Sequence, residues 1–469
     1  MDTARIIARF ICGFSFQELP NNVVDKCKRL ILHEVGCAFG GAKTVAGKAL
    51  IETANLVGGP PVSTVFGGPK SSCLNAAFTN SMLANILDYD DEIPLAGHPG
   101  ATAISPALAL AEMTNASGKD LITSVVAGYE VSVRACRALW PTSERAHKVL
   151  GLGSLQIFGT VASAGRILGL SEDQITNAIG IAGANAPVPS VCKTVEGKYG
   201  VTMSKNNYGI AVAAGTLAVI LAKNGFIGPE DIFEGETGFW RMYNTDRYES
   251  NLMINGLGKL YHILDVCYKA YPAIYFTHGA INAMMNIVRD NDVRPDEVTE
   301  VIVKSHEAHT DLTAISTYRN CEPRNLYQAA FSVPYQMAVT LFRIKPGTDW
   351  FEERRLRDPK ILELARKVKI IYQPTKEEEI PGMPDTSVEV MTSRGKFTNR
   401  VRFPHGSPQK PMPDSELEDK FKALSSGFVE FGAAEQFIKG MYHLEDVRDV
   451  TKLTELVSST CAHIKRNIK

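Results

Sequence analysis

The chain has 469 residues, of which 45% are hydrophobic and 22% charged, and a formal net charge of -1. This is the composition of a globular protein long enough for two domains, and its near-neutral charge excludes an electrostatic case for nucleic acid or an anionic membrane surface. The nine cysteines are scattered, odd in number and without a Cys-x-x-Cys pair, as in proteins of a reducing compartment. We therefore expect a cytoplasmic protein, although Arg5 and Arg9 in an amphipathic first helix leave a mitochondrial location open.

From the N-terminus to about residue 265 the sequence predicts one helix after another. These helices are rich in Ala, Gly, Val, Ile and Leu, and the clearest are residues 23–40, 122–139, 154–168 and 209–223. Helices with so many small residues pack closely on each other, so we expect an all-α core. Ser171 and Gln174 have the spacing of a capping box and predict the start of a further helix.

The pattern changes after residue 266. Alternating apolar and polar residues predict strands at 298–305, 368–372 and 387–392, and the last continues through a turn at 393–396 into 397–403, which predicts a hairpin. Helical patterns alternate with these strands at 279–289, 328–342 and 359–367. This stretch is predicted to be an α+β unit.

A Pro- and Gly-rich stretch at 403–413 predicts a linker, and the chain beyond it reads as helical again, first at 414–424. The predicted fold is therefore mostly α, with a large all-α helical domain formed by residues 1–265 and 414–469. A smaller α+β domain, residues 266–413, is inserted into it. Clefts between two such domains are common places for small-molecule sites, and no segment has the roughly 20 uninterrupted apolar residues that cross a bilayer.

The densest chemistry lies between two predicted helices, at 75–87 and 101–113. Residues 88–92 (Asp-Tyr-Asp-Asp-Glu) bring four carboxylates together, and His98 follows in Gly-His-Pro-Gly. An acidic run alone is most often a solvated loop. Between two apolar helices, with Pro106 placed in a first helical turn, the same residues are expected to be held over a cleft.

Four further places combine an ionisable side chain with glycine or aromatic neighbours. They are His147 and Lys205 at predicted helix starts, Lys269 with His278 at the domain junction, and Tyr335 in the α+β unit. A helix start offers backbone amides to an anionic ligand. Each residue also has a purely structural interpretation, as a histidine bonded to the backbone, a solvated lysine or a core tyrosine. Their combination is what predicts a site.

The order of these motifs resembles the MmgE/PrpD family over essentially the whole chain. The resemblance rests on Asp-Tyr-Asp-Asp at 88–91, His-Pro-Gly at 98–100, His147 before a Gly-rich helix, Met-Ser-Lys at 203–205, Leu-Ala-Lys-Asn-Gly-Phe-Ile-Gly-Pro at 221–229, and Lys-Ala-Tyr-Pro at 269–272 with Thr-His following. The family implies a helical domain with an inserted lid domain, a homodimer and a reaction without cofactor or metal. Its members remove or move a proton next to a carboxylate of a di- or tricarboxylate.

The resemblance also implies roles for individual residues. The catalytic set is Asp88, His98, His147, His278 and Tyr335, and Lys205 and Lys269 match substrate-binding lysines. We add Asp91 and Glu92 of the acidic run to the substrate-binding set, although no family residue is matched to them. We expect His98, oriented by Asp88, to transfer one proton and His147 or His278 the other. The lysines would hold substrate carboxylates, and Tyr335 would donate to the leaving group or the enolate.

Several positions depart from the family pattern. Asn85 stands where a histidine is frequent, Glu92 where threonine is frequent, and the phrases after His147 and Lys205 differ. Since these positions lie on the substrate side, the sequence leaves open a dehydratase, a decarboxylase, an epimerase or isomerase with the same two bases, and a catalytically lapsed helical dimer. A magnesium-dependent isoprenoid cyclase also carries an acidic cluster in an all-α domain, but no second metal motif follows here. Glu92 would repel a polyanion unless it is protonated or paired.

Overall fold

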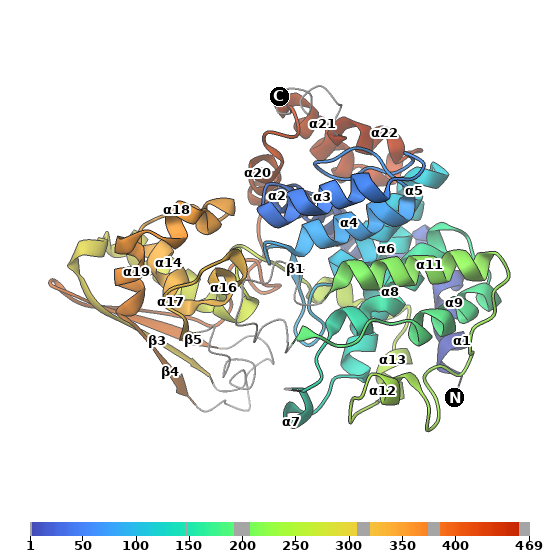
Figure 1. Ribbon diagram of the computed structural model, residues 1–469, viewed down its shortest axis with the longest axis horizontal. Coiled ribbons are helices and arrows are strands. Elements are labelled where there is room, and N and C mark those ends of the chain that lie inside the picture. The colour runs from blue at the N-terminus through green and yellow to red at the C-terminus, as the bar shows by residue number, and fades with distance from the viewer. Residues whose placement is uncertain (1, 147, 192–206, 307–318, 374–384, 459–469) are drawn as a thin grey trace.

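The computed structural model describes residues 2–146, 148–191, 207–306, 319–373 and 385–458. It has a large helical part, formed by α1 to α13 with α20 to α22, and a smaller α+β part, formed by α14 to α19 with the four-stranded sheet (Figure 1). The mostly α character predicted from the sequence is confirmed. Among the described helices, none is both long and apolar enough to span a bilayer.

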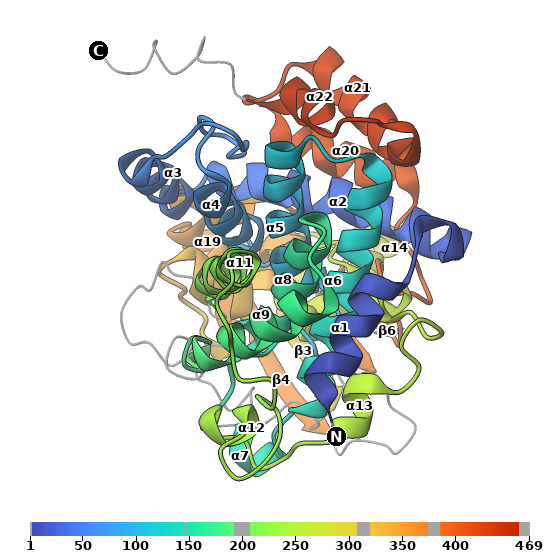
Figure 2. The same ribbon diagram turned by 90° about the vertical axis from the view of Figure 1, so that its right-hand side faces the viewer.

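The helical part packs its outer helices around two central ones, α5 and α8. Its members are α1 (Thr3–Gly13), α2 (Asn21–Ala42), α3 (Val45–Val57), α4 (Cys73–Asn85), α5 (Pro99–Thr114), α6 (Gly118–Ala138), α7 (Ser143–Ala146), α8 (Leu152–Ile167), α9 (Glu172–Ala184), α11 (Tyr208–Lys223), α12 (Phe239–Met242), α13 (Ser250–Ile254), α20 (Asp414–Ser425), α21 (Phe431–Tyr442) and α22 (Thr451–Thr454). Almost every residue of α5 and α8 is buried, and Figure 2 shows both in the middle of this part. A helix that is apolar all round needs such a central position.

Pro106 lies inside α5 and not in a first turn, so the predicted start of this helix was wrong. The helix begins at Pro99, which fits a first helical position because a proline there loses no hydrogen bond. Pro106 leaves the carbonyl of Thr102, four residues earlier, without its usual helical donor. The hydroxyl of Thr160 in α8 donates to that carbonyl at 2.8 Å, which satisfies the buried acceptor.

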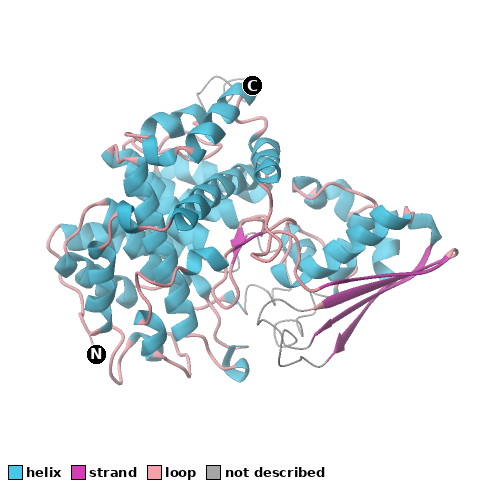
Figure 3. Cartoon of the chain, turned by 180° about the vertical axis from the view of Figure 1, so that it is seen from behind, coloured by secondary structure: helices cyan, strands magenta, loops and turns pink. Residues whose placement is uncertain are grey.

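The α+β part places its helices on one face of a sheet with strand order β4-β3-β5-β6 (Figure 3). Its elements are α14 (His278–Asn291), β3 (Val298–His306), α16 (Leu326–Phe331), α17 (Val333–Leu341), α18 (Glu353–Leu356), α19 (Pro359–Arg366), β4 (Val368–Gln373), β5 (Thr386–Thr392) and β6 (Gly395–Val401). Strand β3 pairs parallel with β4 and antiparallel with β5, and the predicted hairpin β5–β6 is confirmed. Val301, Val303, Val388 and Val390 are buried by the alternation of the strands.

One helix predicted in this part is in fact two. The residues from 328 to 342 are divided between α16 and α17 at Ser332, whose backbone is extended. Pro334 has no N–H and so cannot continue the hydrogen-bond ladder of α16. Ser332 instead caps α17 by accepting from the backbone N–H of Tyr335.

The two parts have separate hydrophobic cores. One core takes residues from Ala4 to Tyr268 and again from Met412 to Val457, and the other takes mainly residues from Tyr271 to Val401. The chain therefore passes from one core to the other close to Lys269.

Candidate active site

The acidic loop lies between α4 and α5, where the helical part meets the α+β part. Its strand β1 (Asp91–Glu92) pairs antiparallel with β2 (Cys267–Tyr268), so that Asp91 faces Tyr268 and Glu92 faces Cys267. This short ladder brings residues 88–92 beside Lys269, which follows β2 directly. Figure 1 shows β1 between the helical part and the α+β part. The β2 strand is held from its other side by Gly406, whose carbonyl accepts from the N–H of Tyr268 at 2.9 Å. Gly406 has a φ of 89°, and a Cβ there would overlap the carbonyl oxygen of Tyr268, so this approach requires glycine.

The loop is not solvated. Asp88 is 5% exposed, and Asp90 and Asp91 are 0% exposed. Burying ionised carboxylates is costly unless each is paired or hydrogen-bonded. The partners of these side chains therefore decide what the site can do.

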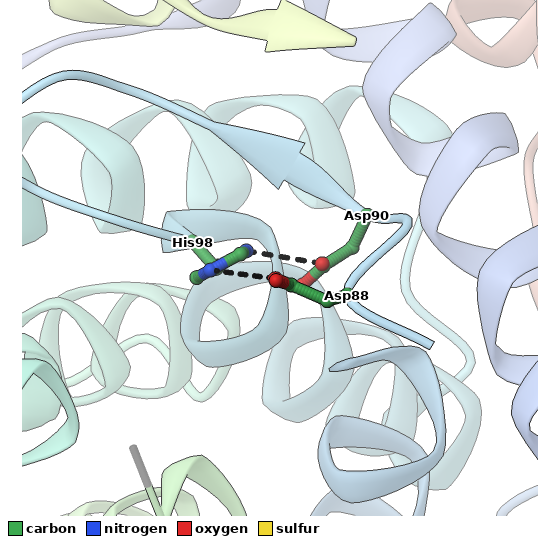
Figure 4. A group of neighbouring side chains, drawn as sticks. All are labelled: Asp88, Asp90 and His98. Atoms are coloured by element: carbon green, nitrogen blue, oxygen red, sulfur yellow. Dashed lines mark hydrogen bonds and ion pairs between the residues drawn. The ribbon is translucent and has the colours of Figure 1, made fainter. Parts of the chain in front are cut away.

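His98 is held by three carboxylates. Its Nδ1 lies 3.0 Å from Asp90 Oδ1, and its Nε2 lies 3.4 Å from Asp88 Oδ1 and 3.3 Å from Glu92 Oε2. Figure 4 shows the ring between Asp88 and Asp90. Burial alone would lower the pKa of His98, but the charges of Asp90 and Glu92 outweigh it and raise this pKa. The ring is therefore disposed to carry a proton.

Asp90 was not among the residues singled out from the sequence. It makes the shorter contact with His98, and its other oxygen accepts from the side-chain amide of Asn85 at 2.9 Å. The expected orienting role of Asp88 is thus shared with Asp90, which acts on the opposite ring nitrogen. The signal for Asp90 was its place in the same acidic run, two residues after Asp88.

Lys269 is fully buried and pairs with the same carboxylates. Its Nζ lies 2.6 Å from Asp88 Oδ1 and 3.7 Å from Glu92 Oε2. Burial would lower the pKa of Lys269, but the charges of Asp88 and Glu92 raise it, so the side chain is an ammonium. Glu92 is therefore paired with both His98 and Lys269, which resolves the repulsion expected from an extra carboxylate. Its side chain is 16% exposed and is the part of this cluster that reaches the surface.

Asp91 faces away from this cluster, toward the start of α5. Its carboxylate accepts from the N–H of Gly100 at 3.1 Å and from the hydroxyl of Tyr129 at 2.8 Å. Burial and the charge of Asp90 raise the pKa of Asp91. The structure therefore gives Asp91 protein donors and a position at the N-terminus of a helix, where a carboxylate is favoured, and does not place it as a ligand for substrate.

Glu34 of α2 lies beside Asp91 and was also missed by the sequence analysis. Its carboxyl group is buried, and neither oxygen has a hydrogen-bond partner among the described residues. Burial, together with the charges of Asp90 and Asp91, raises the pKa of Glu34 well above its usual value. Glu34 is therefore a neutral carboxylic acid behind the cluster.

His278 lies close to Lys269 and Asp88, but in contrast to His98 it is held without a charge. Burial and the charge of Lys269 lower the pKa of His278 to about 3, so the ring is neutral. Its Nε2 lies 3.2 Å from the carbonyl of Ala273, which fixes the proton on that nitrogen. Its Nδ1 is buried and has no partner within the described ranges, so it presents a lone pair.

Tyr335 is not brought to the cluster. Its hydroxyl donates to the backbone carbonyl of Trp350 at 2.5 Å within the core of the α+β part. The charges that act on this hydroxyl are those of Arg355 and Asp358, and not those of the acidic loop. In this structure the tyrosine stabilises its own core. His147 and Lys205, the remaining expected residues, lie outside the described residues.

Two groups of side chains bring three potential metal ligands together, Asp88–Asp90–His98 and Glu34–Asp90–Asp91. A metal on the first would require His98 to lose its proton, because only a neutral imidazole coordinates. It would also compete with the ammonium of Lys269, 2.6 Å from Asp88. In the second group, Oδ2 of Asp91 accepts from the hydroxyl of Tyr129, and both of its oxygens accept from the N–H of Gly100. The donor sets therefore fit protons and an internal cation better than a metal ion.

A cavity of about 610 Å³ reaches Asp88 from the seam between the two parts. Asp88 lies on its wall with Lys43 from the end of α2, Arg324 from the turn before α16 and Arg357 from the turn after α18. The volume is in the range of small-molecule sites. The same wall carries Glu352 and Glu353 beside these cations, and Arg357 pairs with Glu353, so the lining is of mixed charge.

Comparison with known families agrees with this architecture. The MmgE/PrpD N-terminal domain matches residues 5–250, and the MmgE/PrpD C-terminal domain matches residues 271–446. The chain belongs to the MmgE/PrpD family. Relatives in this family include the cis-aconitate decarboxylase of Homo sapiens, 26% identical over 466 residues that cover 96% of this chain and 93% of that protein. The cis-aconitate decarboxylase of Aspergillus terreus is 24% identical over 481 residues, covering 96% of this chain and 95% of its own. The MmgE/PrpD resemblance seen in the sequence is thereby confirmed.

Proposed function

We propose that this protein is a carbon–carbon lyase that decarboxylates a small di- or tricarboxylate without a cofactor. The observation that carries the proposal is the buried imidazole of His98, with carboxylates at both ring nitrogens and a raised pKa. Loss of carbon dioxide leaves an electron pair on carbon, and that carbon must then take a proton from a positioned acid. A histidine kept protonated suits this step. Dehydration would begin by removing a proton, for which a neutral histidine is required.

The proton would leave from Nε2 of His98. Nδ1 donates to Asp90, so this bond holds the ring in one orientation before and after the transfer. Nε2 faces Glu92, the member of the cluster that reaches the surface. The C–C bond to the leaving carboxylate breaks, its electrons stay on the substrate carbon, and the Nε2 proton forms the new C–H bond. Solvent then returns a proton to the imidazole.

The other charged groups would bind substrate and balance the charge. Lys269 places a buried ammonium beside Asp88 and Glu92, which offsets part of their negative charge. We assign binding of the remaining substrate carboxylates to Lys205 and to the cations around the cavity at Asp88. His147 and His278 stay candidates for a second proton transfer, His278 as the neutral partner. The two relatives named for decarboxylation of cis-aconitate support this substrate class.

The α+β part would act as a lid. His98 comes from the helical part, whereas Lys269 and His278 come from the junction where the chain leaves it. A movement of residues 266–413 about this junction would therefore open or complete the cluster. The homodimer expected from the family remains a prediction, which light scattering of the purified protein checks.

The test is turnover of cis-aconitate and of a panel of other di- and tricarboxylates, followed by release of carbon dioxide. In deuterated water the product should carry one new carbon-bound deuterium for each carbon dioxide released. His98→Asn should reduce turnover by roughly 100-fold or more with an unchanged circular dichroism spectrum, whereas His443→Asn, at an exposed histidine of the same chain, should have no effect.

Three results would overturn the proposal. An alkene formed without carbon dioxide indicates a dehydratase, and deuterium in a substrate whose skeleton is intact indicates an epimerase. Full activity of His98→Asn removes the residue on which the mechanism depends.

A further inference from the structure

Lys420 of α20 binds the backbone of both segments that form the site. Its Nζ donates to the carbonyl of Tyr89 at 2.6 Å and to the carbonyl of Lys269 at 2.9 Å, and it lies 2.8 Å from Nε2 of His33. An ammonium has three protons, so these three acceptors use all of them. The same Nζ also lies 3.2 Å from the centre of the Tyr89 ring.

The two carbonyls belong to residues next to the reacting groups. Tyr89 lies between Asp88 and Asp90, the two aspartates on either side of His98. Lys269 is itself the residue whose side chain reaches Asp88. The ladder between β1 and β2 is only two residue pairs long, so it fixes this spacing weakly by itself. The ammonium of Lys420 adds a second link between the two segments.

We propose that Lys420 is a positioning residue of the active site, which sets the distance between the Asp88–Asp90 segment and Lys269 and thereby the acid strength of His98. This inference rests on the proposed function. Lys420 touches no reacting atom in this arrangement. It acts through the backbone of the residues that hold His98.

The groups around Lys420 make its contacts sensitive to pH. The titratable or charged groups that face it are His33, Glu34 and Cys37 from α2, Asp90 from the acidic loop and Lys269 from the segment after β2. Burial lowers the pKa of Lys420 to about 8, with Lys269 adding to the fall and Cys37 and Asp90 opposing it. His33 is neutral, because burial and the charge of Lys420 hold its pKa well below its usual value, so its Nε2 can accept. Above about pH 8 the amine has fewer protons to donate, and one of the three bonds is lost.

A cavity of about 710 Å³ is lined by Lys420 and Tyr89, together with Ala270 and Tyr271. It gives the proton of Lys420 a route to solvent. It also gives room for the longer side chain of arginine, which remains charged at every pH used for assay.

The experiment compares Lys420→Met, Lys420→Arg and a control, Lys422→Met, from the same helix. Lys422 lies beside Glu435 and Phe431 and touches neither strand of the site. We expect Lys420→Met to lower kcat by about 10- to 100-fold, the effect of a displacement near 1 Å, with KM changed less than kcat. Lys420→Arg should keep most of kcat at neutral pH, and its alkaline limb should report the deprotonation of His98 alone, without the contribution of Lys420. Lys422→Met should match wild type in all respects.

A second measurement does not depend on turnover. Amide hydrogen exchange, followed by mass spectrometry, should be faster in the peptides that cover residues 88–92 and 267–270 of Lys420→Met than in those of Lys422→Met. Wild-type kcat together with unchanged exchange in Lys420→Met would overturn the inference, as would loss of most of kcat in Lys420→Arg at neutral pH. If wild type turns over no carboxylate, the proposed function fails, and the exchange comparison still decides whether Lys420 positions these segments.

Discussion

Replacement of Asp90 by Asn isolates the interaction that makes His98 an acid. The carboxylate of Asp90 lies 3.0 Å from Nδ1 of His98, and both side chains are buried. Asparagine has nearly the same shape and can still accept from Asn85 through its carbonyl oxygen, so packing should be retained. Its amide can donate to Nδ1, which favours the neutral ring. The negative charge that opposes the effect of burial on the pKa of His98 is removed.

The size of the change follows from the strength of this bond. A hydrogen bond to a charged group contributes about 1.5–3 kcal/mol, and one pKa unit corresponds to about 1.4 kcal/mol. The pKa of His98 should therefore fall, because burial and the charge of Lys269 still lower it once the charge of Asp90 is gone. At a pH above the wild-type pKa of His98, where this energy is expressed in full, the protonated fraction, and kcat with it, should fall by roughly 10- to 100-fold, and at lower pH by less.

The assay is the pH dependence of carbon dioxide release, together with an NMR titration of the His98 ring. In wild type, activity that needs the imidazolium is lost as pH rises through the raised pKa of His98. In Asp90→Asn this limb should move to lower pH, so that part of the activity returns on acidification. The raised pKa of His98 stabilises the fold at a pH below the pKa of the unfolded chain, and this stability is lost as pH rises through the folded pKa. Asp90→Asn should remove the part of it that Asp90 contributes. Asp446→Asn, which removes one exposed carboxylate, controls for net charge. A limb that stays in place, or moves to higher pH, would refute this account of His98.

Three further changes test the surroundings of the cluster. Glu34→Gln should flatten the dependence of the melting temperature on pH. The raised pKa of Glu34 in the folded protein makes the fold more stable at low pH, and this stability is lost as pH rises from the pKa of the unfolded chain toward that of the folded one. A melting temperature that depends on pH as in wild type would contradict the neutral state of Glu34. Tyr335→Phe should keep kcat and lower the free energy of unfolding by roughly 1–3 kcal/mol, since the carbonyl of Trp350 loses its donor. A loss of kcat without a loss of stability would instead indicate that Tyr335 is catalytic. Lys269→Met should abolish turnover. It should also lower the free energy of unfolding, measured by urea titration, by about 3–5 kcal/mol, because the buried carboxylate of Asp88 loses its ammonium partner. A fully active variant would exclude Lys269 from the site.

The elements of this fold could be predicted wherever the information is local. Residues 209–223 were expected to form a helix, and α11 is Tyr208–Lys223. The capping box of Ser171 and Gln174 is present at the start of α9. These features depend on the spacing of apolar residues and on side chains within one turn, which the sequence shows directly.

The places where prediction failed involve partners far away in the chain. Pro106 is tolerated inside α5 because Thr160, 54 residues later, supplies the missing donor. The site shows the same limit. The acidic loop and His98 stood out as a local motif, whereas Glu34 and Lys420 carry no motif and enter the cluster only through tertiary packing. Burial, which decides the protonation of all these groups, is a property of the whole fold.

The segments that make the site also determine when it can form during synthesis. Glu34 and His98 are translated first, Lys269 is translated well after them, and Lys420 follows 151 residues after Lys269. Domains generally fold as they emerge, the N-terminal part first, so the helices around the acidic loop would be made long before their last partner. The nascent chain would thus hold buried carboxylates without their cations, and the helical part should reach its full stability only after α20 has emerged.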